Sequence, residues 1–333
     1  MGIMDSAGID VGAQELVGTL SRDGQFLRRT FPNTSPGHQA ICRWLTGGDR
    51  ITRVCVEATG SYGLDLALVL SRSEQVQIMV ANPRAVRRFA EALMERNKTD
   101  AVDADVLEQF TARMPFQPWV APSKQALELR TISRRIASLR TVCAAEKNRR
   151  HAAGLTQYTP QSVHDSIDRL IETLDLEIKD LIKHAQALVR SEPTLKSRYD
   201  LAVTACGIGP LSAILLLAEL AYLPPDMDAR QWVAHAGLDP KHHRSGTSVE
   251  KKPRISKAGN RFLRKALFMP AMTARSHDPA LKAFADHLVQ RGKTPLQAIV
   301  AVMRKLLTAL HAMFRKGQPF LSEKLRPSLS TSP

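Results

Sequence analysis

Short apolar runs alternate between strand and helix patterns over the first hundred residues. Two of the runs stop at a carboxylate, Asp10 in Ile9-Asp10-Val11-Gly12 and Glu57 in Val56-Glu57-Ala58-Thr59-Gly60. The patterns predict strands ending at Asp10, over 15–20, over 26–31, ending at Glu57 and over 76–80, with a hairpin turn at 22–24 and helices over 35–45 and 62–70. A further helix is expected after the last strand, so the predicted order is β-β-β-α-β-α-β-α.

This order is that of a ribonuclease H-like fold, in which a mixed sheet carries helices on its faces. In that topology the first and fourth strands are neighbours. We therefore expect Asp10 and Glu57 to lie close together.

Two further acids, Asp100 and Asp103, lie three residues apart in Lys98-Thr99-Asp100-Ala101-Val102-Asp103. On a helix they share one face, whereas Asp105 is rotated about 160° from Asp103. Carboxylates removed from water are costly unless they are paired or bind a cation. The four acids Asp10, Glu57, Asp100 and Asp103 therefore predict a site for Mg²⁺ or Mn²⁺. A solvated acidic helix start remains the alternative for the aspartate pair.

The middle of the chain is predicted to consist of two long helices. The proline-rich segment 114–122 breaks the first pattern, and apolar residues then recur in alternating steps of three and four. The repeating positions are Leu129, Ile132, Ile136, Leu139 and Cys143, and then Ile171, Leu174, Ile178, Leu181, Ala185 and Leu188. Each helix has room for about 30 residues, typical of a coiled-coil hairpin or an oligomerisation arm. The alternative is two amphipathic helices packed on their own domain.

The last third is expected to be mainly helical. Gly207-Ile208-Gly209-Pro210 predicts a turn before an apolar helix over 211–222, and such a turn could contact phosphate or simply join two helices. We place three domains at 1–115, 116–198 and 199–333.

The formal net charge of +15 makes a polyanion such as nucleic acid the expected partner. No apolar stretch of about 20 residues and no signal peptide are recognised, so we expect a cytoplasmic protein without membrane contact. The four cysteines, Cys42, Cys55, Cys143 and Cys206, form no CxxC pair, which argues against a zinc knuckle or a disulfide framework.

Positive charge is concentrated between Lys241 and Lys265, where nine Lys or Arg residues accompany the single acid Glu250. The expected phosphate contacts are Lys241, Arg244, Lys251, Lys252, Arg254, Lys257, Arg261 and Arg264. Ser245 stands in this segment between an arginine and a glycine, in what we expect to be a flexible loop. From the residues alone Ser245 is a hydrogen-bond donor to phosphate, a turn residue or a nucleophile. His242 and His243 are expected to be solvated or to contact phosphate.

Taken together, Ile9-Asp10-Val11-Gly12, the Glu57 motif, Lys98-Thr99-Asp100-Ala101-Val102-Asp103 and Gly237-Leu238-Asp239-Pro240 with the later Ser245-Gly246 resemble a known family. It is the DEDD transposases and recombinases of bacterial insertion sequences, which include Piv-type invertases and bridge-RNA-guided serine recombinases. The likeness covers nearly the whole chain, with a RuvC-like N-terminal domain, a coiled-coil connector and a C-terminal transposase domain.

The resemblance implies that Asp10, Glu57, Asp100 and Asp103 bind Mg²⁺ and that Ser245 attacks DNA, with Ser248 as the second choice for the nucleophile. It implies a covalent phosphoserine link, strand exchange, and a composite site built from different protomers of a dimer or tetramer. A structured guide RNA would select donor and target DNA, and the active protein would be associated with the nucleoid. The rival interpretations are a metal-only RuvC-like junction nuclease and a non-catalytic nucleic-acid-binding protein.

Overall fold

The computed structural model describes residues 4–57, 62–94, 99–245 and 249–321, and for residues 241–245 and 249–253 it describes the backbone only. The chain divides into two compact units, residues 1–121 and residues 122–333.

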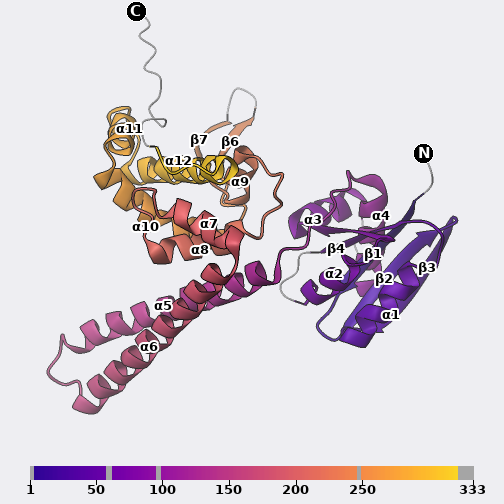
Figure 1. The fold of residues 1–333 in the computed structure, drawn as a ribbon, viewed down its shortest axis with the longest axis horizontal. Coiled ribbons are helices and arrows are strands. Elements are labelled where there is room, and N and C mark those ends of the chain that lie inside the picture. Colours follow the sequence, from indigo (N-terminus) through magenta and orange to yellow (C-terminus); the bar gives the residue numbers. More distant parts are fainter. Residues whose placement is uncertain (1–3, 58–61, 95–98, 246–248, 322–333) are drawn as a thin grey trace, which may run out of the picture. The chain divides into compact units, whose positions relative to one another are not determined.

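The first unit is built on a five-stranded mixed sheet with the strand order β3-β2-β1-β4-β5 (Figure 1). Its strands are β1 (Asp5–Val11), β2 (Glu15–Arg22), β3 (Gln25–Pro32), β4 (Thr52–Glu57) and β5 (Val76–Ala81). The first three strands are antiparallel, and β1, β4 and β5 run parallel. The predicted strands are therefore confirmed, and so is the expectation that the first and fourth strands are neighbours.

Helices cover both faces of this sheet because its strands alternate apolar side chains between the two sides. Ile9 and Val56 point into a core shared with α1 (Ser35–Leu45) and α2 (Leu64–Leu70). Cys55 points to the opposite core, which is shared with α3 (Pro83–Ala92) and α4 (Asp100–Arg113).

The sequence predicts one helix after the last strand, and the structure has two, α3 and α4. Helix α3 begins at Asn82-Pro83, directly after β5, where no helix start was predicted. The side chain of Asn82 accepts a hydrogen bond from the Arg84 N–H, and Pro83 occupies the first helical position. Proline is well suited to that position because the first N–H groups of a helix have no partner within the helix.

Helix α4 lies unusually close to β1 at Gly8. A methyl group at Gly8 would lie 2.2 Å from the Glu108 nitrogen and 2.4 Å from the Ala104 oxygen. The Thr111 hydroxyl donates to the Ala7 carbonyl over 2.9 Å, which holds the helix against the same strand. The missing side chain at Gly8 therefore sets the distance between α4 and the sheet.

The segment after α4 returns to the sheet. The Trp119 N–H donates to the Ile78 carbonyl of β5 over 2.7 Å, and Trp119 packs on the core shared with α1 and α2. Arg53 lies over the Phe116 ring at 4.9 Å. The first unit therefore includes residues up to Ala121.

The second unit begins with the two long helices expected from the sequence, α5 (Lys124–Ala153, 30 residues) and α6 (Gln161–Ser191, 31 residues). They lie side by side in Figure 1, and Leu139 and Cys143 pack against Ile171 and Leu174. Near the start of α5, Leu129 instead packs in a cluster that includes residues of a third helix, α8 (Pro210–Leu220).

The rest of the second unit is mainly helical. It contains α7 (Pro193–Ala202), α8 (Pro210–Leu220), α9 (Ala229–His235), α10 (Arg261–His277), α11 (Pro279–Gln290) and α12 (Pro295–Lys316). Between α9 and α10 the backbone forms an antiparallel pair, β6 (Pro240–Ser245) and β7 (Val249–Ile255). The expectation of a flexible loop was wrong for the residues of β6 and β7. Their sequence is rich in charged residues and lacks the alternation of apolar and polar residues by which a strand is recognised.

Helix α12 also corrects an expectation. By length and composition it could cross a membrane, although the sequence was expected to contain no such segment. Half of the apolar window is buried within the protein, where Val302, Leu306 and Leu310 are completely buried in the main core of the second unit. Its hydrophobicity is therefore explained by packing.

We predict that Gly8→Ala lowers the free energy of unfolding of the first unit by about 1–3 kcal/mol, the usual cost of overpacking. The reason is the collision of the new methyl group with the backbone of α4. Chemical denaturation followed by circular dichroism measures the loss. Gly63→Ala is the control, because its methyl group would meet Val11 at an ordinary 3.6 Å. Equal effects of the two substitutions would contradict the explanation.

Candidate active site

Asp10 and Glu57 stand at equivalent ends of neighbouring strands. The last pair of the parallel β1–β4 ladder is Ile9 with Val56, and the two acids follow immediately. Side chains alternate along a strand, so Asp10 shares a face with Gly8, and Glu57 shares a face with Cys55. Both acids therefore belong to the face of the sheet that α4 covers.

The first turn of α4 carries the other two acids. Thr99 caps the helix by accepting a hydrogen bond from the Val102 N–H, which fixes where the helix begins. Asp100 and Asp103 lie on the side of the helix that continues to Leu107 and Thr111, which pack on the sheet. The turn that holds the pair is thereby directed toward the end of β1.

The electrostatics of Asp10 reflect this arrangement. Burial, together with the charges of Asp103, Asp100 and Glu57, raises its pKa from 3.8 to about 6, although a hydrogen bond from the Val11 N–H acts in the opposite direction. All four predicted acids are thus close enough to interact. Repulsion among carboxylates of this kind is relieved by a proton or by a cation.

The donor set fits a hard divalent cation, because it consists of carboxylate oxygens. Among the residues that the structure describes, however, no three Asp, Glu, His or Cys side chains are gathered closely enough to hold a metal ion as they stand. The four acids are close enough to influence the pKa of Asp10, but they do not form a complete metal coordination sphere.

Asp105 has a different environment. It accepts a hydrogen bond from the Thr19 hydroxyl at 2.7 Å and forms an ion pair with Arg28, so it is bound to β2 and β3. Burial raises the pKa of Glu108, which lies one turn further along α4, and the charge of Asp105 raises it as well. These contacts favour Asp100 and Asp103 as the aspartates of the acidic group.

The predicted nucleophile belongs to the β6–β7 hairpin of the second unit. The backbone of Ser245 ends β6 and pairs with Val249. The side chains of Ser245, Lys241, Arg244, Lys251 and Lys252, and those of His242 and His243, lie outside the described part of the structure, as does the whole of Ser248.

The remaining predicted phosphate contacts differ in their surroundings. Arg254, Lys257 and Arg261 are exposed, and Arg261 lies 5.0 Å from the centre of the Phe262 ring. Arg264 instead donates from Nη1 to the Ala236 carbonyl over 2.8 Å, and burial lowers its pKa. Part of its hydrogen-bonding capacity is therefore used inside the protein.

A buried ionic cluster around Glu219 was not singled out from the sequence. Glu219 is 2% exposed in α8 and pairs with Arg130 and Arg134 of α5. The signal in the sequence was Glu219 as a single acid inside an otherwise apolar helix, together with Arg130 and Arg134, which are one helical turn apart in an earlier helix. Such an acid requires a buried partner.

Comparison with known proteins identifies the chain. A DEDD transposase model of the IS110 type matches residues 7–160, and a model of the transposase IS116/IS110/IS902 family matches residues 199–286. The first match contains all four predicted acids, and the second contains the β6–β7 hairpin.

Three relatives are similar over nearly their whole length. The pilin gene-inverting proteins of Moraxella bovis and Moraxella lacunata are each 30% identical over 320 residues, covering 94% of this chain and 96% of the relative. An uncharacterized 43.6 kDa protein of insertion element IS110 from Streptomyces coelicolor is 24% identical over 384 residues, covering 93% of this chain and 94% of the relative.

These matches define an enzyme of the DNA transposase and recombinase class. The chain belongs to the IS110 family of transposases.

The raised pKa of Asp10 predicts a specific dependence of stability on pH. Between pH 3.8 and about 6 the folded protein binds this proton more tightly than the unfolded chain does. The metal-free protein therefore loses stability as the pH rises through this window. Asp10→Asn should raise the unfolding free energy at about pH 8 by about 1 kcal/mol, after allowing for solvent screening, and change it little at about pH 4.

Thermal unfolding in chelator-treated buffer at the two pH values measures this difference. The exposed Asp49, replaced by Asn, is the control and should show no such dependence on pH. A stabilisation by Asp10→Asn that is equal at both pH values would contradict the assigned cause.

Proposed function

We propose that the protein is a site-specific DNA recombinase that mobilises an insertion sequence. The observation that supports the proposal is the electrostatic interaction of Asp10 with Glu57, Asp100 and Asp103 in a member of a transposase family. The relatives named for gene inversion, which align over 94% of this chain, support a reaction in which strands are both cut and rejoined.

The proposal includes a finer interpretation of the fold. We infer that the first unit is a RuvC-like, ribonuclease H-like domain, as the sheet order and its two helical layers suggest. We propose three domains, 1–115, 116–198 and 199–333, in which residues 116–121 begin the connector in sequence but pack on the first unit. Helices α5 and α6 form a coiled-coil connector.

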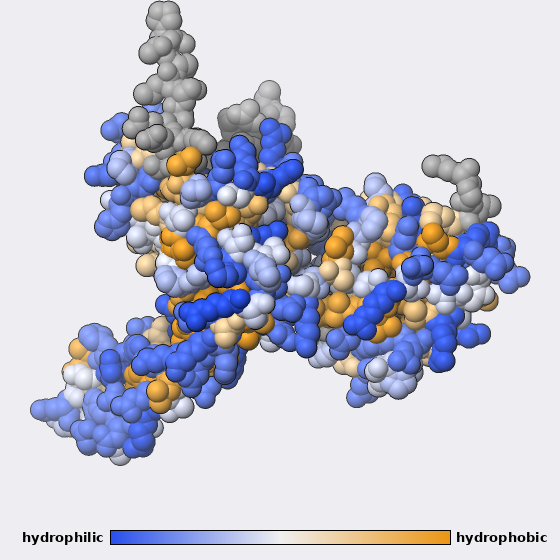
Figure 2. Space-filling view, viewed as in Figure 1, coloured by the Kyte–Doolittle hydropathy of each residue, from blue (hydrophilic) through white to orange (hydrophobic). Residues whose placement is uncertain are grey.

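The connector is proposed to join protomers in a dimer or tetramer. The visible surface of the long helices is mostly hydrophilic (Figure 2), yet α6 also exposes apolar side chains, with Leu170 43% and Leu176 61% exposed. Exposed leucines on a long helix provide area for association with another helix.

Asp10, Glu57, Asp100 and Asp103 are proposed to hold Mg²⁺, or Mn²⁺ in its place. The bound metal would polarise a DNA phosphodiester and stabilise charge that develops on its oxygens. The pKa of Asp10 is raised by burial and by the charges of the neighbouring acids, and this supports the role because a site selected for a cation tolerates such repulsion.

Ser245 is proposed as the nucleophile, with Ser248 as the alternative. Its hydroxyl oxygen would form a bond to phosphorus while the bond from phosphorus to a deoxyribose oxygen breaks. The hydroxyl proton is transferred, in net terms, to the leaving oxygen. The phosphoserine link conserves the phosphodiester bond energy, so the reverse attack by a new strand end completes strand exchange.

Donor and target DNA are the proposed substrates, and a structured guide RNA is the proposed source of sequence specificity. The net charge of +15 supports polyanionic partners. The exposed Arg254, Lys257 and Arg261 are the described side chains best placed to contact phosphates.

We predict that wild-type protein incubated with cognate DNA, guide RNA and Mg²⁺ forms a covalent protein–DNA product. Ser245→Ala should abolish the product while retaining DNA binding, and Asp10→Ala should reduce the cleavage rate by at least about 100-fold. Denaturing gels with labelled DNA measure the product. Cleavage by Ser245→Ala would favour a metal-only nuclease, and equal inertness of wild type and Asp10→Ala would favour a non-catalytic binding protein.

Magnesium binding supplies a separate prediction. At a concentration about 100-fold above its Kd, Mg²⁺ should stabilise the wild-type protein by about 2.7 kcal/mol. Asp103→Asn should remove most of this gain. Asp105→Asn should retain it, although that variant loses the charge paired with Arg28. Thermal shift titrations compare the variants, and the reverse order would show that the wrong aspartate was chosen.

A further inference from the structure

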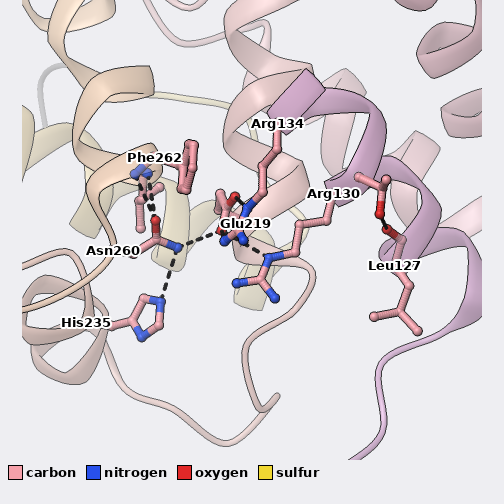
Figure 3. Close-up of polar contacts among 9 residues, drawn as sticks. Leu127, Arg130, Arg134, Glu219, His235, Asn260 and Phe262 are labelled. Atoms are coloured by element: carbon pink, nitrogen blue, oxygen red, sulfur yellow. Dashed lines mark hydrogen bonds and ion pairs between the residues drawn. The ribbon is translucent and has the colours of Figure 1, made fainter. Parts of the chain in front are cut away.

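Glu219 is the centre of a buried polar cluster that joins three helices of the second unit (Figure 3). It lies near the end of α8 among completely buried apolar residues such as Leu216 and Leu217. A carboxylate in such a position is strongly destabilising unless its charge is neutralised.

Two arginines of α5 supply that charge. Arg134 contacts both carboxylate oxygens, with Nε at 2.8 Å from Oε1 and Nη2 at 3.1 Å from Oε2, and the Arg130 Nε lies 3.3 Å from Oε2. Burial raises the pKa of Glu219, but the hydrogen bonds from Arg134 and Asn260 and the charges of both arginines together lower it. Glu219 is therefore held as a carboxylate.

Aromatic rings restrict where these arginines can lie. The Arg130 guanidinium lies 3.7 Å from the centre of the Tyr222 ring, and that of Arg134 lies 4.4 Å from the centre of the Phe262 ring. Phe262 belongs to the first turn of α10, so Arg134 contacts both α8 and α10. Planar stacking of this kind orients a guanidinium as well as stabilising it.

Asn260 connects the carboxylate to the start of α10. Its Nδ2 donates to Glu219 Oε2 over 2.6 Å, while its Oδ1 accepts from the Phe262 and Leu263 N–H groups and so caps the helix. Its own N–H donates to the His235 carbonyl at the end of α9 over 2.7 Å. Through its side chain and its backbone N–H together, Asn260 thus joins α8, α9 and α10.

The base of the β6–β7 hairpin is formed by the segment that leads into Asn260 and by the residues that follow α9. The Ser256 N–H donates to the Asp239 carbonyl over 2.9 Å, and the Ser256 hydroxyl donates to Asp239 Oδ1 over 2.6 Å. The Lys257 N–H donates to the Gly237 carbonyl over 3.1 Å. Both strands therefore leave the helical body through a short bonded segment that ends at Asn260.

We propose that Glu219 is a positioning residue, which uses Arg130, Arg134 and Asn260 to fix the base of the β6–β7 hairpin and to tie its orientation to helix α5. For catalysis the inference rests on the proposed role of Ser245, because that serine ends β6. The hairpin is then directed by the same helix that continues into the long α5–α6 pair. Movement of α5 is transmitted to the hairpin base through Glu219 and the arginines that pair with it.

Two variants interrupt the connection in different ways. Glu219→Gln keeps the size of the side chain but leaves two arginines without their negative charge. Asn260→Ser retains a good helix-capping residue, since serine accepts the same N–H bonds, but its side chain is too short to reach Glu219. Because the second variant disturbs the core little, it keeps the test valid if the first fails to fold.

Glu146→Gln is the matched control. Glu146 is also a buried glutamate of this unit, 7% exposed and paired with Arg149, but it lies near the opposite end of α5. The Glu146→Gln variant shows how a general loss of stability affects exchange and cleavage when the contacts of the hairpin base are unchanged.

The experiment combines amide hydrogen exchange with single-turnover DNA cleavage by the full chain. In Glu219→Gln and Asn260→Ser, exchange at Ser256 and Lys257 should become at least about tenfold faster. The cleavage rate at saturating DNA should fall about 10- to 100-fold while the Kd for DNA changes less than about twofold. Glu146→Gln should change neither quantity.

Unchanged exchange at Ser256 and Lys257 in both variants would overturn the inference, whatever the chemistry of cleavage. Faster exchange with a wild-type cleavage rate would overturn the positioning role alone. If Ser245→Ala cleaves normally, the proposed nucleophile is wrong, and the exchange rates still decide whether Glu219 fixes the hairpin.

Discussion

A carboxylate taken out of water must find positive charge, and the two units meet this constraint in opposite ways. In the second unit Glu219 is neutralised by two arginines and an amide, and its pKa is lowered. In the first unit Asp10 has three acidic neighbours, and its pKa is raised to about 6. The first arrangement is complete within the chain and holds helices together, whereas the second would become favourable on binding the proposed cation. The contrast supports a structural role for Glu219 and the proposed metal-binding role for Asp10.

In both units the residues proposed to be reactive stand at or near the ends of strands and are supported by closely packed helices. Asp10 lies next to the last residue of β1, Glu57 ends β4, and α4, which approaches β1 at Gly8, carries a third and a fourth acid near the same end of the sheet. Ser245 ends β6, whose base is bonded to α9 and α10. A small shift of a supporting helix would therefore move the residues proposed to be reactive. For this reason the backbone contact of α4 at Gly8 affects the position of Asp100 and Asp103.

Much of the first unit could be predicted because its information is local. Alternating apolar residues defined the strands, and the acids marked where the strands end. The start of α3 was missed because Asn82-Pro83 is equally suited to end a strand and to begin a helix. Glu219 was missed because its partners are distant in sequence, Arg134 by 85 residues and Asn260 by 41. The β6–β7 pairing was missed because a run of charge gives no alternation to recognise.

The bond from Trp119 to Ile78 has a consequence for how the first unit can exist alone. Strand β5 is the last in the sheet, and the returning chain covers part of its outer edge. A fragment that stopped at residue 115 would leave that carbonyl and the neighbouring apolar surface open to strands of other molecules. The chain leaving the domain therefore also protects it from aggregation, so a soluble N-terminal fragment has to extend to residue 121.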